Sequence, residues 1–249
     1  MERRNKETTI ASYVLPCYIP DEEIMALTRS AIESFKQVKA ELIIADDASL
    51  IGGGYLREQA DTYIRTQENE GYYSTISRAI KMAKGEIVAL CNNDIRVAPN
   101  WLEVAKIIMI NPKVVSVHFR MIDYDAPMTF GDEVWIKGKE RWCSTSFVAV
   151  RKKIYKEIGF YDPFFKRGGF GDYDLWHRVR LAGYETAYTN KSCYQHRDSA
   201  ITNKMHDKNW IQSEKDNMEY FKQKWGDFPN ELFSKTFPRQ MEKNWKPFP

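Results

Sequence analysis

Residues 41–49, ELIIADDAS, form an apolar run of strand length that ends at two aspartates. This stretch decides the fold, because a second run of the same kind, Ile10 to Leu15, precedes it and ends at Pro16. Between the two runs, Asp21 is placed to cap a helix whose apolar residues recur at spacings of three and four. Strand, helix and strand in this order favour a parallel sheet.

The alternation of helix and strand continues to about residue 120. Periodicity predicts a helix over 72–84, stopped by Gly85, and a second helix that starts near Pro99 and ends before Pro112. Short apolar runs predict strands over 86–91 and 114–119. The first 120 residues therefore read as a doubly wound α/β half.

Beyond residue 120 the pattern is less regular. The segment Met121 to Trp142 has little periodicity, and we interpret it as a loop with room for one edge strand. The remaining expected elements are strands over 145–150 and near 192–194, and helices over 152–158, 172–182 and 207–225. With no internal repeat or low-complexity linker, one domain over 1–200 with a helical, aromatic-rich extension over 201–249 is preferred to two independent domains.

Composition excludes several classes of protein. The 249 residues carry 37 Lys and Arg against 34 Asp and Glu, and a net charge of +3 argues against a dedicated nucleic-acid binder. The four cysteines are dispersed without a CxxC pair, so neither a zinc site nor a disulfide framework is expected. No run has the length of a membrane span, and the N-terminus lacks the apolar core of a signal peptide. We expect a cytoplasmic protein.

Polar residues gather where the predicted strands end. Ligands of open parallel sheets bind at the carboxyl ends of the strands, so these positions are candidates for a site. Satisfaction of turn amides is the alternative for each cluster taken singly. The clusters are Pro16-Cys17-Tyr18, Asp46-Asp47-Ala48-Ser49, Asn92-Asn93-Asp94, and His196 after the late strand.

Further motifs join these clusters in a fixed order along the chain. They are Asn69-Glu70-Gly71, Ala83-Lys84-Gly85-Glu86, Pro99-Asn100-Trp101-Leu102, Ile158-Gly159-Phe160-Tyr161-Asp162, and Gly171-Asp172-Tyr173-Asp174-Leu175 with Arg178 and Ala182-Gly183-Tyr184. In this order and spacing, over roughly residues 10–197, the sequence resembles the inverting glycosyltransferases of family 2, which have the GT-A fold. The resemblance implies a nucleotide-binding half over about 8–120 and an acceptor half over about 121–200.

The resemblance implies that the early strand ends bind a nucleoside-diphosphate sugar. Tyr18 offers a ring face to a base, Pro16 shapes the turn, and Asp47 offers a carboxylate to a ring N–H, which favours uracil or thymine. A UDP-sugar is therefore expected, with a dTDP-sugar as the other option. The remaining residues expected at the donor are Ser49, Asn69, Gly71, Asn92 and Asn93.

A divalent cation is implied at the donor diphosphate, which gathers negative charge as it leaves. Asn92-Asn93-Asp94 corresponds to the DXD-like motif of the family, and only Asp94 is acidic. His196 stands where some metal-dependent relatives place a histidine on the same ion. An imidazole ligand suits Mn²⁺ better than Mg²⁺, so Mn²⁺ is favoured, with a structural histidine as the alternative.

Inverting transfer requires a base that takes the proton of the acceptor hydroxyl. In the Glu-Asp-x-Asp pattern of the family the first Asp corresponds to Asp172, which we expect to be this base. A helix N-cap is the alternative role, and Asp174 competes for the assignment. Gly171 occupies the place of the Glu, so a contact that relatives make to the acceptor or the sugar is expected to be missing. Asp174 and Arg178, four residues apart, are expected to form an ion pair.

These residues predict metal-assisted, inverting transfer of a sugar to a hydroxyl of a glycan or another acceptor. A noncatalytic nucleotide-sugar or glycan-binding module is the alternative, because the Asn92–Asp94 motif is weakened. A nucleotidyltransferase is disfavoured, because no glycine-rich phosphate loop follows the first strand. The aromatic stripe of the last helix predicts packing on the domain, while a lid, a dimer contact or a peripheral membrane contact stay open.

Overall fold

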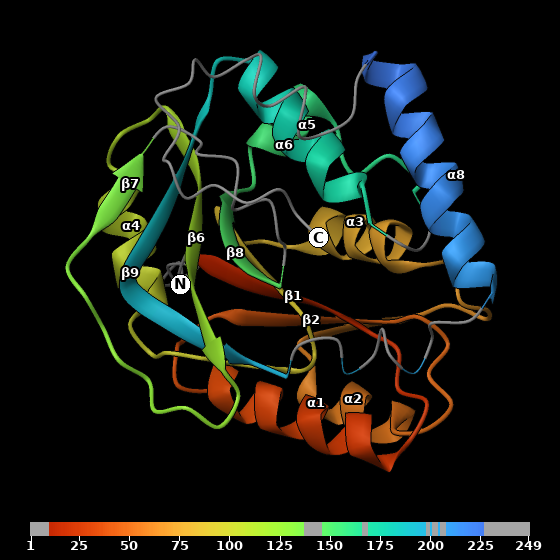
Figure 1. The fold of residues 1–249 in the computed structure, drawn as a ribbon. Helices are drawn as coiled ribbons and strands as arrows, with labels where there is room; N and C mark the ends of the chain where they lie inside the picture. The colour runs from red at the N-terminus through yellow and green to blue at the C-terminus, as the bar shows by residue number, and fades with distance from the viewer. Residues whose placement is uncertain are drawn as a thin grey trace, which may run out of the picture.

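A computed structural model describes residues 10–136, 146–165, 169–197, 200, 204 and 208–226. It is built on one mixed sheet with helices on both faces (Figure 1). The first part of the chain forms β1 (Ala11–Cys17), α1 (Glu22–Phe35), β2 (Glu41–Asp46), α2 (Gly53–Gln59), β3 (Thr62–Arg65), α3 (Tyr72–Met82) and β4 (Ile87–Cys91). The later part forms β5 (Ile95–Val97), α4 (Trp101–Ile108), β6 (Val114–Asp123), β7 (Val134–Ile136), β8 (Phe147–Arg151), α5 (Ile154–Ile158), α6 (Gly171–Leu181), β9 (Glu185–His196) and α8 (Lys208–Trp225).

The strands lie in the order β3-β2-β1-β4-β8-β6-β9-β5, and β7 pairs with β9 outside this path. The first four strands of this order are parallel, as are β6 and β9. The other pairings, β4–β8, β6–β8, β5–β9 and β7–β9, are antiparallel. This confirms the α/β class and the mixed GT-A type sheet expected from the sequence.

Alternate residues of each central strand pack on opposite faces of the sheet. In β1, Tyr13 and Leu15 face the core under α1 and α4, whereas Val14 faces the core under α3, α5 and α6. Buried parallel strands have apolar residues on both faces, which explains the continuous apolar runs of the sequence. Figure 1 shows the two helical layers, with α1 and α2 on the side opposite α3, α5 and α6.

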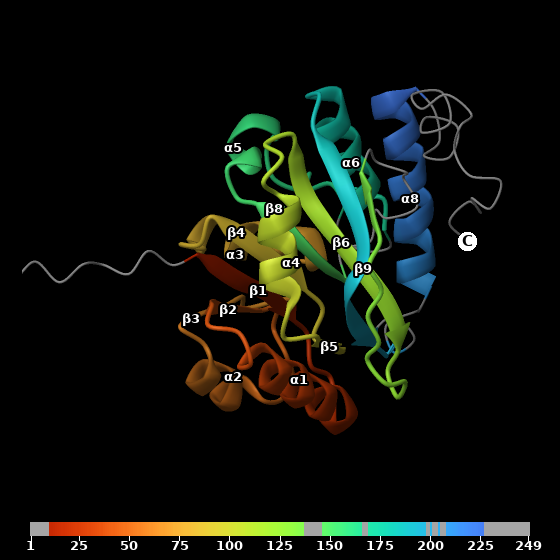
Figure 2. The same ribbon diagram turned by 90° about the vertical axis from the view of Figure 1, so that its left-hand side faces the viewer.

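The last helix packs against the layer that contains α6. Phe221 of α8 is fully buried between Phe170 and Tyr173. Trp225 is half-buried, and its indole N–H donates to Asp174 at 3.0 Å. Figures 1 and 2 both show α8 lying beside α6. Among the described residues, no helix combines the length and apolar character needed to cross a bilayer.

Several boundaries differ from the sequence-based expectations. Pro16 does not end the first strand but lies inside β1, opposite Ala45 of β2. Gly85 does not cap α3, which ends at Met82. A Cβ at Gly85 would lie 2.5 Å from the backbone of Ala11, so the close approach of residue 85 to β1 requires glycine. The late strand is longer than predicted and ends on His196 itself. The elements α2, β3 and β5 were not predicted.

Candidate functional site

Asp47 organises the carboxyl end of β2. Its carboxylate accepts hydrogen bonds from the backbone N–H groups of Glu70 at 2.8 Å and Gly71 at 2.9 Å, and from the Thr66 hydroxyl at 3.2 Å. The Asn69 amide donates to the Asp47 carbonyl at 3.4 Å. The structure thus brings three of the predicted donor residues together at the start of α3. The buried carboxylate is occupied by the protein's own donors, so its predicted contact with a base stays untested.

The end of β1 lies directly beside Asp47, whose backbone N–H donates to the Cys17 carbonyl at 2.7 Å. Tyr18 follows Cys17 and is half-buried. Ser49, another predicted donor residue, is buried, and its hydroxyl accepts the Ile19 N–H at 3.0 Å. This bond fixes the two strand-end loops to each other, so the Ser49 hydroxyl has a role within the fold whether or not it contacts a nucleotide.

Asp46, next to Asp47, is the centre of a cluster that sequence reasoning did not identify. Its side chain is fully buried and accepts from the Tyr63 hydroxyl at 2.6 Å and from the Arg65 guanidinium. Arg65 also donates to the Ser49 carbonyl at 2.8 Å. Tyr63 and Arg65 both lie on β3, a four-residue strand whose brevity hid it from periodicity analysis.

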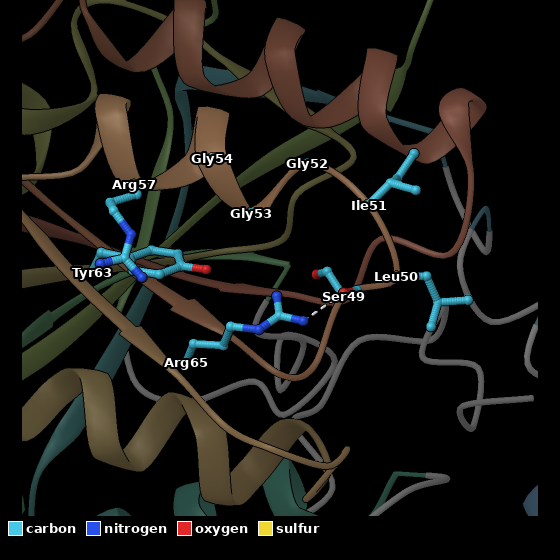
Figure 3. Close-up of a pocket in the computed structure, with 9 residues that line it drawn as sticks. All are labelled: Ser49, Leu50, Ile51, Gly52, Gly53, Gly54, Arg57, Tyr63 and Arg65. Atoms are coloured by element: carbon cyan, nitrogen blue, oxygen red, sulfur yellow. Dashed lines mark hydrogen bonds between the residues drawn. The ribbon is translucent and has the colours of Figure 1, made fainter.

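A shallow pocket of about 330 Å³ opens beside this cluster (Figure 3). Of the predicted site residues, only Ser49 lines it; the other predicted residues lie elsewhere. The pocket therefore flanks the predicted donor edge and does not coincide with it. Its lining consists of Ser49, Leu50, Ile51, Gly52, Gly53, Gly54, Arg57, Tyr63 and Arg65.

The two asparagines of the predicted DXD-like motif have different surroundings. Asn92 is half-buried; its amide oxygen accepts from the Tyr72 hydroxyl and its amide nitrogen donates to the Ser146 hydroxyl, both at 3.4 Å. Asn93 is buried and donates to the Thr28 hydroxyl of α1 at 2.9 Å. Asn92 thus lies at the edge that carries the start of α3, whereas Asn93 is tied to the opposite helical layer.

Asp94 and His196 are brought together by the pairing of β5 with β9. Ile95 lies opposite His196 in this antiparallel pair, and the Arg197 N–H donates to the Asp94 carbonyl at 3.0 Å. As a result, Asp94 Oδ1 lies 3.2 Å from His196 Nε2. Both side chains are buried, and among the described residues no donor forms a hydrogen bond with Asp94 Oδ1.

This pair fits a divalent cation. Two adjacent ligands of an octahedral ion with bonds of about 2.1 Å stand about 3 Å apart, close to the observed separation. The other ring nitrogen of His196, Nδ1, lies 3.4 Å from the Met121 sulfur, which directs Nε2 toward Asp94. In the described part of the chain, no cluster of three or more His, Cys, Asp or Glu could hold a metal. A cation here would need further ligands beyond these two side chains.

Asp172 lies in the first turn of α6 and is half-buried. The residue before it, Gly171, packs against the ring of Tyr73 from α3: a Cβ at Gly171 would lie 2.6 Å from Tyr73 Cζ. Burial raises the pKa of Tyr73, and the charge of Asp172 raises it further; hydrogen bonds with the backbone of Gly171 and Asp172 oppose the rise. The candidate base therefore lies next to the helix that starts at the donor edge.

Asp174 is fully buried and belongs to a separate ion cluster. It accepts from Arg178 Nη2 at 2.8 Å, as the four-residue spacing predicted. It is also bound by Lys224 at 2.7 Å and by the Trp225 indole at 3.0 Å, both from α8. This set of cations and donors gives Asp174 a structural role and leaves Asp172 as the more accessible carboxylate of α6.

Comparison with known proteins identifies the family. A family model described as Glycosyl transferase family 2 matches residues 12–165, which include the predicted strand-end residues up to Asp94. The chain belongs to glycosyl transferase family 2. A search of curated proteins finds no significant match.

Solved structures of glycosyltransferases share the fold of this family 2 chain at low identity. The structure of S. aureus TarS 1–349 with UDP-GlcNAc matches with a TM-score of 0.68 at 12% identity, over 91% of this chain and 71% of that one. GalNAc-T7 with UDP, GalNAc and Mn²⁺ matches with a TM-score of 0.60 at 16% identity, over 77% of this chain and 44% of that one. The chain therefore spans less than half of GalNAc-T7.

A third structure extends the comparison to another nucleotide. The mannosyltransferase PcManGT from Pyrobaculum calidifontis, in complex with GDP-Man and Mn²⁺, matches with a TM-score of 0.55 at 15% identity. It covers 74% of this chain and 55% of that one. At these identities the comparisons show a shared GT-A fold, and the identity of donor and acceptor must be argued from the family 2 chain itself.

Proposed function

We propose that this family 2 chain transfers a sugar, with inversion at the anomeric carbon, from a nucleoside-diphosphate sugar to a hydroxyl of a glycan or another acceptor. The observation that carries the proposal is the buried pair of Asp94 and His196, 3.2 Å apart, at the edge of the sheet where the predicted donor residues gather. Such a pair is suited to a cation that neutralises a leaving diphosphate.

The donor is a UDP-sugar in this proposal, with a dTDP-sugar as the other pyrimidine option. In this proposal the Tyr18 ring stacks on the base, and Pro16 makes the end of the strand rigid. The hydrogen bond from Gly71 to Asp47 holds the loop that would enclose the base. Side-chain amides for hydrogen bonds with the donor come from Asn69, Asn92 and Asn93. Ser49 holds the loop after β1 through its hydrogen bond with Ile19. UDP is present in the TarS and GalNAc-T7 complexes, while PcManGT holds a guanine nucleotide.

Asp94 and His196 would hold the cation, and the donor's diphosphate oxygens and water would complete its shell. When bound, the cation supplies positive charge that stabilises the diphosphate as it leaves. Mg²⁺ is usually bound through carboxylates, phosphates and water, whereas the imidazole of His196 favours Mn²⁺. GalNAc-T7 and PcManGT are both described with Mn²⁺, which supports this choice.

Asp172 is the general base of the proposed reaction. The acceptor oxygen attacks the anomeric carbon from the side opposite the diphosphate, and the Asp172 carboxylate takes the proton of that hydroxyl. A positioned base of this kind contributes about 10²- to 10⁴-fold in rate. Asp174 does not compete for this role here, because Arg178 and Lys224 occupy its carboxylate.

The experiment measures the nucleoside diphosphate that the purified chain releases from a panel of donors, UDP from UDP-sugars and dTDP from dTDP-sugars, with Mn²⁺, with Mg²⁺ and with chelator. We expect release from at least one donor that depends on Mn²⁺. Proton NMR of the transfer product, once an acceptor is found, should show a β linkage from an α-linked donor. A chain that binds UDP with Mn²⁺ but neither hydrolyses nor transfers any donor would be a noncatalytic nucleotide-sugar-binding module instead.

A further inference from the structure

Gly171 has no room for a side chain. A Cβ there would lie 2.6 to 2.8 Å from three atoms of the Tyr73 ring. This ring is 5% exposed, stacks on Tyr161 at 5.1 Å between ring centroids, and meets the edge of Phe165 at 6.4 Å. Because Tyr73 is held on these sides, it cannot withdraw to admit a larger residue. Tyr73 therefore occupies the space that a longer residue at 171 would need.

The hydroxyl end of Tyr73 meets the start of α6. The backbone of Gly171 and Asp172, in the first turn of that helix, lowers the pKa of this hydroxyl, which fits a hydroxyl that lies beside their N–H groups. The N-cap residue Phe170 offers no side-chain cap, and its backbone is left-handed, with a φ of +68°. The first N–H groups of a helix lack partners within the helix, so a hydroxyl from elsewhere can take over the missing cap. The Tyr73 ring, from α3, is packed against Gly171 at this helix start.

The same turn of α3 is tied to the donor edge. The helix begins at Tyr72, directly after Gly71, whose N–H donates to Asp47 at 2.9 Å. Tyr72 donates to Asn92 at 3.4 Å. Tyr73 thus stands between the loop that carries the predicted donor residues and the helix turn that carries Asp172.

We propose that Tyr73 is the positioning residue of Asp172: its ring fills the space beside Gly171, and its hydroxyl caps the first turn of α6, which fixes the base relative to the donor edge. This inference rests on the proposed function, in which Asp172 is the base. Tyr73 acts through the backbone of α6 and contacts no substrate in this role.

Tyr155 offers a matched control. Its hydroxyl is also buried, and the charge of Asp172 also raises its pKa after the larger effect of burial. Among the described residues, however, the Tyr155 hydroxyl has no hydrogen-bond partner. Removal of the hydroxyl from Tyr73 and from Tyr155 therefore deletes the same atom from two rings near Asp172, and only the first deletion breaks a bond to the helix start.

The first test compares Tyr73→Phe with Tyr155→Phe and wild type, using the donor that the panel identifies. Loss of one positioning hydrogen bond should lower kcat of Tyr73→Phe by about tenfold. The KM for donor and the Kd for UDP with Mn²⁺ should stay within about twofold of wild type, and so should kcat of Tyr155→Phe. A Tyr73→Phe variant with wild-type kcat, or one in which KM alone changes, would overturn the proposal.

The second test uses the contact at Gly171. Gly171→Ala should lower kcat in the wild-type background, because the Tyr73 ring cannot withdraw and the methyl group therefore moves the helix start away from it. In a Tyr73→Leu background the ring atoms that the methyl group meets are gone, so adding Gly171→Ala should cost little further activity. Equal losses in both backgrounds would contradict the role of Tyr73, and circular dichroism confirms that each variant is folded.

The Asp172→Asn variant tests the proposed base separately from the positioning role of Tyr73. If Asp172→Asn is inactive and Tyr73→Phe is fully active, the positioning role fails and the proposed base stands. If Asp172→Asn retains wild-type turnover, the proposed base itself fails, and the positioning role of Tyr73 fails with it.

Discussion

Asp94 Oδ1 lies 3.2 Å from His196 Nε2, although the two residues come from the two halves of the chain. The three-residue strand β5, paired antiparallel with the end of β9, creates this contact. Asp94 Oδ1 accepts no hydrogen bond within the described part of the chain, so this oxygen is available to the cation proposed above.

Replacement of Asp94 by alanine should abolish the effect of Mn²⁺ on UDP binding, because an acidic ligand of the proposed cation is lost. Isothermal titration of UDP with and without Mn²⁺ measures this directly. Asp125→Asn is the matched control, since Asp125 is an exposed carboxylate paired with Arg197, beside His196. If UDP binding by Asp94→Ala still depends on Mn²⁺, the proposed cation site is wrong.

Asp47→Asn should lower the free energy of unfolding by about 1–3 kcal/mol and weaken UDP binding. The carboxylate accepts two backbone N–H groups, from Glu70 and Gly71, on its two oxygens. An amide offers only one oxygen, so one of these N–H groups would face an NH₂ group. Urea unfolding and UDP titration measure the two effects, with Glu68→Gln in the same loop as an exposed control. Unchanged stability and affinity would mean that the Asp47 contacts are dispensable.

Asp174→Ala should destabilise the protein by about 3–5 kcal/mol, because Arg178 and Lys224 would lose a fully buried counter-charge. The loss should detach α8 from α6 before the sheet unfolds, since Lys224 and Trp225 both contact Asp174 from α8. Hydrogen exchange of α8 together with denaturant unfolding tests this. Lys215→Ala, an exposed position on the same helix, should have no effect; an equal effect there would refute the role of the Asp174 cluster.

The lowered pKa of His177 predicts a specific pH dependence of stability. Burial, with the charge of Arg180 second, lowers the pKa of His177 from 6.5 to about 4. The unfolded chain therefore binds a proton between these pH values that the folded chain does not, so stability falls as the pH drops from about 6.5 to about 4. The contribution is at most about 3 kcal/mol. Urea unfolding at several pH values should show a weaker slope for His177→Gln; identical slopes would contradict the assignment.

Much of the first half of the fold could be predicted because its signals are local. The apolar runs of β1 and β2 mark strands buried on both faces, and Asp21 caps α1 as expected, with its carboxylate 3.1 Å from the Ile24 N–H. By contrast, β3 and β5 have only four and three residues, too few to show a period. The cluster of Asp46 with Tyr63 and Arg65 stayed hidden for that reason.

The candidate site could be predicted largely by residue type, and only in part by contact. Strand ends and family motifs drew attention to Asp47, Asp94 and Asp172, because the carboxyl ends of parallel strands meet at one edge. The Asp94–His196 contact depends on the register of β5 with β9, and the Tyr73–Gly171 contact depends on how α3 and α6 pack. The family resemblance already implied that Asp94 and His196 share an ion, whereas no local pattern encodes the Tyr73–Gly171 contact, which only the folded chain reveals.

The most direct test of the central claim is the turnover of Asp172→Asn beside wild type, with the donor that gives UDP release, in the presence of Mn²⁺. We expect the variant to bind UDP with Mn²⁺ as tightly as wild type, because Asp172 acts on the acceptor. Its kcat for sugar transfer should fall by about 10²- to 10⁴-fold. A variant that transfers sugar at the wild-type rate would contradict Asp172 as the base of an inverting reaction.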